Sequence, residues 1–214
     1  MYVNTENFSC LPLALTVSPN PGQGRRRQIG PFQLDLKMLD RFNRLVVGLG
    51  RSHPLECDQI VAAADSLETN PAHEATPDCI AQRFRQAEPV SRLLSDSGWT
   101  PLHEVAPVLE AVQAYVLDTD DLIPDGLPRF GRLDDAIVIE TAWPRISDEV
   151  LSYLDFCRLR EFEAQLRGIA SNEFVFTRDD WEVSRRAEGE LRRHQRRVRN
   201  SSFVPRPVTY FRVH

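Results

Sequence analysis

Six aspartates lie between positions 118 and 135 of this chain, a density of carboxylates that could bind a metal ion. Hard cations such as calcium and magnesium take several oxygen ligands, and carboxylates supply them. The spacing does not fit an EF-hand loop, which needs Asp-x-Asp-x-Asp-Gly and a later glutamate. Two interpretations stay open: a metal site, or carboxylates that cap the turn and the following helix. The six candidate residues are Asp118, Asp120, Asp121, Asp125, Asp134 and Asp135.

The elements around these aspartates are predicted to be two helices joined by a stiff turn. Apolar residues spaced three and four apart predict a helix from Ala106 to Leu117, and the short acidic side chains that follow end it. Two X-Pro pairs favour extended backbone within the turn. Gly126 and Gly131 are expected to adopt positive φ. A second helix should begin near Asp134 and Asp135, whose charges suit its first turn, and end at residue 143 ahead of a proline. This placement favours the capping interpretation.

The same stretch resembles the signature of the YkvA-like domain family. Members of that family carry something close to Asp-Pro-x-Asp-Leu-Ile-Pro-Asp, a short spacer with Ile-Pro and Gly, and then Leu-Asp-Asp. The resemblance spans residues 106–143, and the family has no agreed activity, so it implies an architecture and a functional surface rather than a reaction. Thr119 stands where the family usually has proline, and Gly126 stands where a bulky apolar residue is common.

The rest of the chain indicates a mainly α, single globular helical domain of seven or eight helices. Hydrophobic periodicity predicts a helix from Phe32 to Leu49, and cap residues predict further helices that begin near Ser147 and Thr177. We expect an N-terminal arm at 1–30, a helical domain at 31–170, and a basic helix with its tail at 171–214. Short strands at 13–17 and within 203–214 could pair. The residues expected to form the buried face after Pro144 are Leu151, Leu154, Leu159, Phe162 and Leu166.

The predicted C-terminal helix is strongly basic. Residues 184–200 contain seven arginines and two glutamates, a local charge of +5 in a chain whose net charge is −5. The helix is either solvated and laced with local ion pairs, or a docking surface. As a docking surface it would suit an acidic protein partner, then nucleic acid, then anionic lipid, with the acidic turn of the same chain as a further alternative. The candidate binding residues are Arg192, Arg193, Arg196 and Arg197.

Several functional classes lack support in the sequence. It has no Gly-x-Ser-x-Gly elbow, no His-Glu-x-x-His pair and no phosphate-binding glycine loop. Its four cysteines lie far apart, which indicates buried or half-buried thiols in a reducing cytoplasm and neither a zinc site nor a disulfide framework. It also lacks an apolar run of about eighteen residues, so we expect a soluble cytoplasmic protein, with peripheral membrane contact as the remaining alternative.

These observations favour a non-catalytic interaction or regulatory protein. Its recognition surfaces would be the acidic turn and the arginine-rich helix, and its partner would be another protein, with nucleic acid disfavoured by the negative net charge. The alternative is a metal-dependent enzyme or metal-binding module built on the aspartates. The sequence indicates no particular cofactor, metal or oligomeric state.

Overall fold

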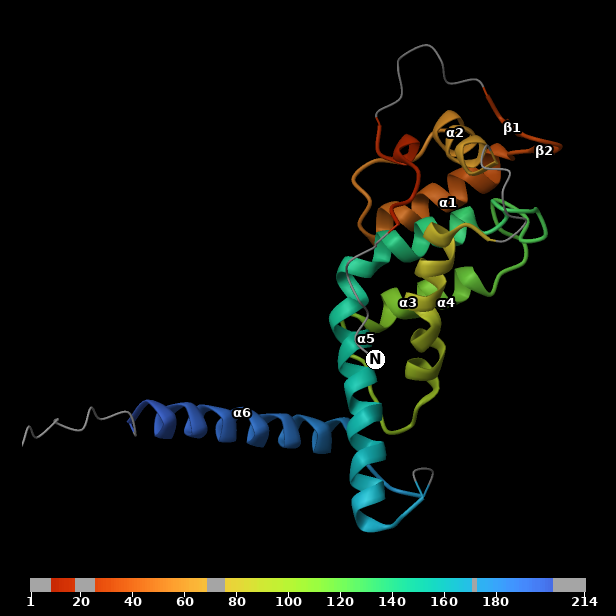
Figure 1. Cartoon of the computed structure of the whole chain (residues 1–214). Coiled ribbons are helices and arrows are strands. Elements are labelled where there is room, and N and C mark those ends of the chain that lie inside the picture. Colours follow the sequence, from red (N-terminus) through yellow and green to blue (C-terminus); the bar gives the residue numbers. More distant parts are fainter. Residues whose placement is uncertain (1–8, 18–25, 69–75, 171–172, 202–214) are drawn as a thin grey trace, which may run out of the picture. The chain divides into compact units, whose positions relative to one another are not determined.

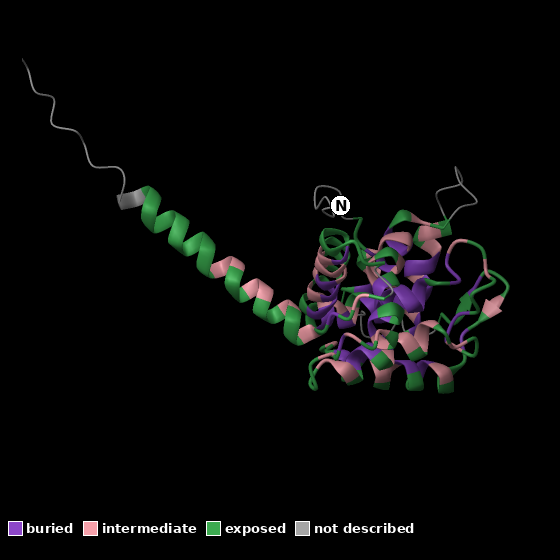
Figure 2. Ribbon diagram, turned by 90° about the horizontal axis from the view of Figure 1, so that it is seen from below, coloured by how far each residue is buried: buried purple, intermediate pink, exposed green. Residues whose placement is uncertain are grey.

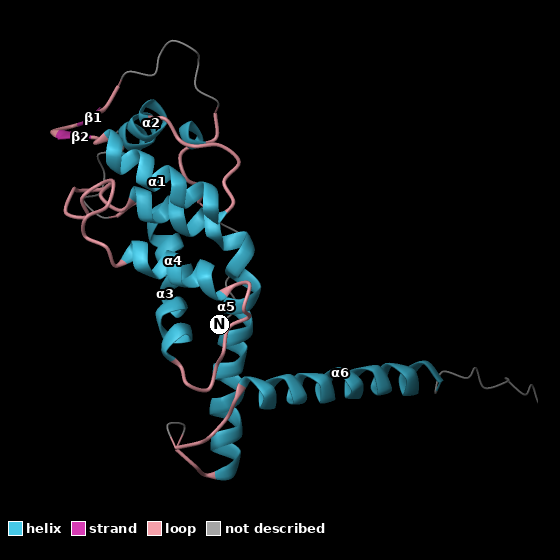
Figure 3. Cartoon of the chain, turned by 180° about the vertical axis from the view of Figure 1, so that it is seen from behind, coloured by secondary structure: helices cyan, strands magenta, loops and turns pink. Residues whose placement is uncertain are grey.

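A computed structural model describes residues 9–17, 26–68, 76–170 and 173–201, and these residues are mainly helical, as predicted (Figures 1 and 3). They form six α-helices, one short 3-10 helix and a two-stranded sheet. None of the described helices is long and apolar enough to cross a membrane. In chain order the elements are η2 (Leu13–Leu15), β1 (Gln28–Ile29), β2 (Phe32–Gln33), α1 (Leu36–Leu49), α2 (Cys57–Glu68), α3 (Asp78–Ser95), α4 (Ala106–Val116), α5 (Leu133–Arg167) and α6 (Arg178–Ser201).

The first long helix begins later than its periodicity predicted. Gly30 turns the chain at a φ of 52°, so that Ile29 pairs with Phe32 in a small antiparallel hairpin. Asp35 then caps α1 by accepting a hydrogen bond from the Lys37 amide at 2.7 Å. Residues 32–35 are therefore strand and cap, although their apolar side chains continue the helical pattern.

The helix predicted to end at residue 143 instead runs through Pro144 as part of α5. Proline in a helix interior costs about 3 kcal/mol because it removes a hydrogen bond and crowds the preceding turn. Ala142, Ile146 and Val150 repeat every four residues and are all buried, so packing against the core offsets that cost. The predicted new helix at Ser147 is consequently wrong, and the described helices number fewer than expected.

The buried face of α5 after the proline also differs from the prediction. Val150, Tyr153 and Phe156 are buried there. Trp99 packs edge-on against Tyr153 and donates its indole N–H to the buried Glu149 at 3.0 Å. These two contacts determine which side of α5 faces the core at this point. The residues expected to be buried are largely exposed, since Leu151, Leu154, Phe162 and Leu166 lie on other sides of the helix.

The core of the helical region joins α1, α3, α4 and the first half of α5 (Figure 2). Phe42 of α1 lies 5.8 Å from Tyr115 of α4, ring centre to ring centre. Arg83 of α3 is buried and pairs with Glu140 of α5 at 2.6 Å, which ties those two helices together. These contacts set the frame on which the turn between α4 and α5 is built.

Contacts divide the chain into two units, residues 1–154 and 155–214, each described here by itself. The three-part division at residues 30 and 170 stays a prediction.

The predicted strand at 13–17 is wrong, because Leu13–Leu15 is a 3-10 helix, and its expected partner within 203–214 lies outside the described residues. The cysteines form no disulfide among the described residues; Cys10 is exposed, contrary to expectation.

Candidate metal centre between two helices

The acidic turn, residues 118–132, joins α4 to α5 and is the green segment between them in Figure 1. Its backbone folds on itself: the Leu127 amide donates to the Pro124 carbonyl at 3.0 Å, and the Gly131 amide donates to the Leu127 carbonyl at 3.1 Å. Leu133 continues this pattern into α5 by donating to Phe130 at 2.9 Å. The turn is thus ordered by short-range hydrogen bonds, in keeping with its proline and glycine content.

Apolar side chains fix the acidic turn to the core. Leu122, Ile123 and Leu133 are all buried, with exposed fractions of 2%, 0% and 0%. Phe130 is also buried. These side chains therefore anchor the turn to the core, and the neighbouring Asp121, Asp134 and Asp135 have carboxylate oxygens drawn into the interior with them.

The two glycines of the turn have a different role from the one predicted. Neither Gly126 nor Gly131 is among the described residues with positive φ, whereas Arg129 has a φ of 68°. A Cβ atom on Gly131 would lie 2.5 Å from the Leu127 carbonyl oxygen, so the absence of a side chain is needed for space. A Cβ on Gly126 would meet nothing within 4 Å.

Asp134 and Asp135 occupy the first turn of α5, as predicted, but they are buried rather than solvated. Asp134 accepts two hydrogen bonds through Oδ2, from the Tyr115 hydroxyl at 2.7 Å and from the Ile123 amide at 3.1 Å. Its second oxygen, Oδ1, is buried without a hydrogen-bond partner, and so is Oδ1 of Asp135. Capping therefore accounts for only part of the hydrogen-bonding capacity of these two carboxylates.

Three carboxylates converge beside this pair. Asp121, Asp125 and Asp135, here called the carboxylate cluster, each place an oxygen within 4.8 Å of the others. Both oxygens of Asp121 are buried and lack hydrogen-bond partners. Calcium binds oxygens at about 2.4 Å, so two ligands on opposite sides of it lie about 4.8 Å apart. The spread of the cluster thus matches what one hard cation can bridge.

Burial and mutual repulsion make the negative charges of Asp121, Asp134 and Asp135 unfavourable, which raises their pKa values. Burial raises the pKa of Asp135 to about 8, and the Asp134 charge adds to the shift. Burial and the Asp121 charge raise the pKa of Asp134 to about 7. Burial, with the Asp125 charge, likewise raises the pKa of Asp121 to about 6. Arg132 provides a counter-charge, 3.6 Å from Asp125. Close carboxylates in a poorly solvated place are stabilised by protons or by a cation.

The remaining two candidate aspartates stand apart from this group. Asp118 pairs with Arg41 of α1 at 3.1 Å and accepts a hydrogen bond from the Asp120 amide, so it shapes the start of the turn. Asp120 is exposed. The structure therefore separates the six candidates into surface residues and an inward-facing set, a division that their spacing alone did not show.

Tyr115 and Arg132 were not among the predicted site residues. Tyr115 sits at an apolar position of the α4 pattern, yet a half-buried phenol needs a hydrogen-bond partner, and that requirement was the available signal. Burial and the Asp134 charge raise the pKa of Tyr115, so its hydroxyl remains a donor. Arg132 gave a weaker signal, its place immediately before the Leu-Asp-Asp segment.

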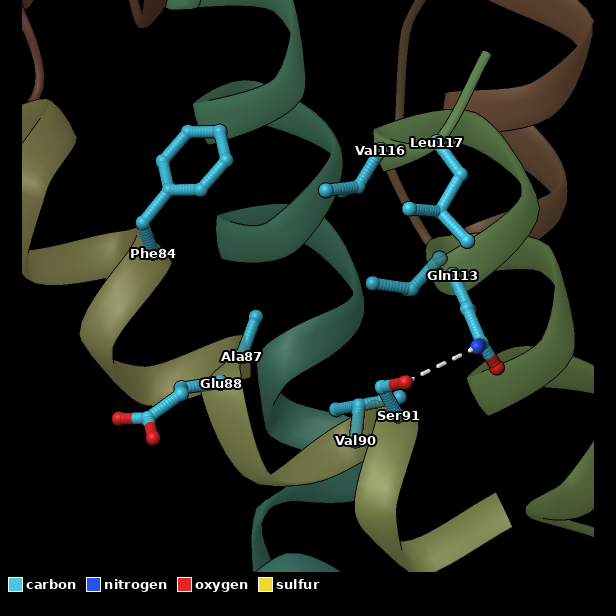
Figure 4. A pocket seen from close by; sticks show the side chains of 9 residues that line it. Phe84, Ala87, Glu88, Val90, Ser91, Gln113, Val116 and Leu117 are labelled. Atoms are coloured by element: carbon cyan, nitrogen blue, oxygen red, sulfur yellow. Dashed lines mark hydrogen bonds between the residues drawn. The ribbon is translucent and has the colours of Figure 1, made fainter. Parts of the chain in front are cut away.

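An apolar pocket lies between α3 and α4 (Figure 4). Its volume is about 160 Å³, and two of its lining side chains are joined by a hydrogen bond that Gln113 donates to Ser91 at 3.4 Å. Phe84 lines it and also lies 4.7 Å beneath the guanidinium of Arg132, which links the pocket wall to the carboxylate cluster. The lining residues are Phe84, Ala87, Glu88, Val90, Ser91, Val112, Gln113, Val116 and Leu117.

The arginine-rich helix is formed as predicted, and its first turn has the expected capping box. Thr177 and Asp180 exchange hydrogen bonds, with the Thr177 amide donating to Asp180 at 2.9 Å. Arg192 pairs with Glu188 at 2.5 Å, a local ion pair of the predicted kind. The other candidate arginines, Arg193, Arg196 and Arg197, are exposed.

No protein-family model, curated protein or solved structure matches this chain. The resemblance to the YkvA-like family therefore rests on the motif of residues 106–143 alone, and membership stays a prediction. The function has to be inferred from the geometry of the acidic turn.

Proposed function

We propose that this chain is a divalent-cation-binding module whose carboxylate cluster takes up a hard cation at the junction of α4 and α5. The supporting observation is the convergence of three carboxylates within 4.8 Å, with buried oxygens that have no hydrogen-bond partner. Asp121, Asp125 and Asp135 would be the protein ligands. Water would complete the coordination, since three carboxylates supply only part of the six to eight oxygens that calcium takes.

The cation would act on the conformation of the hairpin. Asp121 and Asp125 come from the turn, and Asp135 comes from α5, so one ion would join the turn to the helix. Asp134, next to Asp135 in the chain, accepts a hydrogen bond from Tyr115 and so connects this end of α5 to α4. Binding would neutralise carboxylates whose burial is otherwise unfavourable, and it would stabilise the packing of α4 against α5.

Burial favours a cation over a protein partner at this point. A protein surface cannot reach Asp134 or Asp135, which are 0% and 1% exposed, whereas a small ion can enter beside the exposed Asp125. The surface residues Asp118 and Asp120 remain accessible, so a protein partner could still bind the outer side of the cation-bound turn. A cytoplasmic location, expected from the cysteine pattern, is kept as part of it.

The test is a comparison of melting temperatures after EDTA treatment and after addition of calcium, magnesium or manganese. At least one ion should raise the melting temperature of the wild-type chain and of Asp120→Asn, an exposed aspartate outside the cluster. The same ion should leave Asp121→Asn and Asp135→Asn unchanged. Titration calorimetry should show heat with the first two proteins only. The proposal fails if no ion gives a shift or heat at concentrations up to about 10 mM, beyond the weakest natural calcium modules.

A further inference from the structure

Helix α6 has an apolar seam that its own chain leaves exposed in the described structure. Ala187, Leu191, His194 and Val198, here called the α6 seam, repeat at alternating steps of four, three and four residues and therefore share one side of the helix. Leu191 and Val198 are 56% and 49% exposed. The contacts of α6 with the end of α5 come from a different side: Trp181 donates to Asp155 at 2.8 Å, and Arg185 donates to the same carboxylate at 2.6 Å.

The second half of α6 is poorly stabilised by itself. Every described residue from Glu190 to Arg199 is exposed. Arg192 and Arg196, like Arg193 and Arg197, lie one helical turn apart, and like charges at that spacing destabilise a helix. Helices in proteins gain most of their stability from packing of an apolar face, and short helices without such packing are marginal in water. This segment therefore needs an anionic surface that also covers the seam.

The charges of α6 are divided along its length. Residues 178–190 contain five acidic side chains and three arginines, whereas residues 191–199 contain five arginines and no acidic side chain. A parallel copy of the helix would place the basic half against itself. An antiparallel copy would place the acidic half of each helix beside the basic half of the other, so the complementary surface is present in the chain itself.

We propose that two copies of this chain associate through α6 in an antiparallel pair. We place the two helices so that Leu191 packs beside His194 of the second copy, and Ala187 packs beside Val198 of the second copy. Glu190 and Arg197 flank the seam, so Glu190 of each copy faces Arg197 of the other, twice by symmetry. A shallow hollow receives the opposing side chain; its lining residues are Ala187, Glu190, Leu191, Arg193, His194 and Arg197. This pairing stands independently of the cation proposal.

The association should be weak, since the seam is short and includes a histidine. We expect a dissociation constant in the micromolar range or weaker, because small interfaces with few apolar anchors give transient complexes. Trp181, near the start of α6, is far along the helix from the seam centre, so variants at the centre leave its contact with Asp155 intact.

Sedimentation equilibrium of charge variants tests the pairing. Arg197→Glu and Glu190→Arg should each weaken dimerisation at least tenfold, since each brings like charges together across the seam. The double variant should recover it. Arg196→Glu is the matched control: it makes the same charge change on the side of the helix opposite the seam, and it should leave dimerisation within a factor of two. Circular dichroism checks that α6 remains helical in each variant.

Cysteine cross-linking tests the direction. In a Cys10→Ser, Cys157→Ser background, a mixture of Leu191→Cys and His194→Cys chains should form a mixed disulfide dimer faster than either variant forms one alone. Preferential self-cross-linking of Leu191→Cys would indicate a parallel pair and would overturn the proposed register. A wild-type chain that remains monomeric at every concentration would overturn the proposal altogether. Equal binding losses to an anionic polymer in Arg196→Glu and Arg197→Glu would then point to nucleic acid.

Discussion

At the scale of residues, the burial of individual carboxylates explains why a cation should stabilise the acidic turn. Asp135 is 1% exposed and has an oxygen without a hydrogen-bond partner, beside the similarly buried Asp134. An unsatisfied buried polar group costs about 1–3 kcal/mol, and more when it is charged. The residues that suit a cation thus lower the stability of the cation-free fold.

Replacing Asp135 with asparagine should therefore stabilise the cation-free protein at neutral pH by about 1–3 kcal/mol, because it removes a carboxyl that ionises in the unfolded chain but is held protonated by burial in the folded one. Thermal unfolding in EDTA measures the change. The exposed Asp120→Asn serves as the control and should unfold at the wild-type temperature. A melting temperature below that of the wild type would show that Asp135 is paired in a way that the described contacts do not include.

The pKa values predict the pH dependence of the cation-free protein. Those of Asp121, Asp134 and Asp135 are raised from 3.8 to about 6, 7 and 8. Between about pH 4 and pH 8 the folded state therefore holds protons that the unfolded chain has released, and the free energy of unfolding falls as pH rises. In EDTA the melting temperature should be higher at pH 5.5 than at pH 8, with a smaller difference in Asp135→Asn. A saturating cation should reduce this slope, whereas a flat profile in EDTA would contradict the burial of these groups.

Gly131 is a position where a single methyl group should be damaging. Its added Cβ would lie 2.5 Å from one carbonyl oxygen and 2.6 Å from another, both in backbone that cannot move aside cheaply. Gly131→Ala should destabilise the protein by about 1–3 kcal/mol, as overpacking usually does. Gly126→Ala is the matched control, with no atom within 4 Å of the added group. Equal denaturation midpoints for the two variants would refute this account of the turn.

At the scale of elements, the capping box of α6 gives a separate prediction. Thr177→Ala removes a side chain that exchanges hydrogen bonds with Asp180, and such changes cost about 1 kcal/mol. We expect lower helicity by circular dichroism. Ser184→Ala, which removes a mid-helix hydroxyl bonded to the Asp180 carbonyl, should leave helicity unchanged or raise it. The reverse order of effects would show that Thr177 does not initiate the helix.

Local patterns predicted the elements well where tertiary packing agreed with them. The periodicity of Ala106–Val116 and the Thr177 cap placed two helices correctly. Pro144 did not end α5, because the buried residues on both sides stabilise a continuous helix. The aspartates were recognised as a group, yet their separation into buried and surface residues depends on Leu122, Ile123 and Leu133 reaching the core together. That outcome is decided by contacts between distant segments, which a single sequence does not display.

At the scale of the whole molecule, the acidic turn is part of the core as much as of the surface. Ile123 is 0% exposed, so Ile123→Asp would bury an unpaired charge in the centre of the helical region. We expect this variant to lose its cooperative unfolding transition, as followed by circular dichroism. Asp120→Asn, close by in sequence and exposed, should retain it. A folded Ile123→Asp protein would mean that the turn can detach while the helices stay packed.

The hydrogen bond from the Ile123 amide to Asp134 has a consequence for dynamics. Amides in turns commonly exchange with solvent deuterium within seconds to minutes, since local opening there is easy. This one is buried and bonded to a side chain of the next helix, so its exchange requires α4 and α5 to separate around the turn. Ile123 should thus be a slowly exchanging amide outside any helix, and its rate would report how often the two helices part.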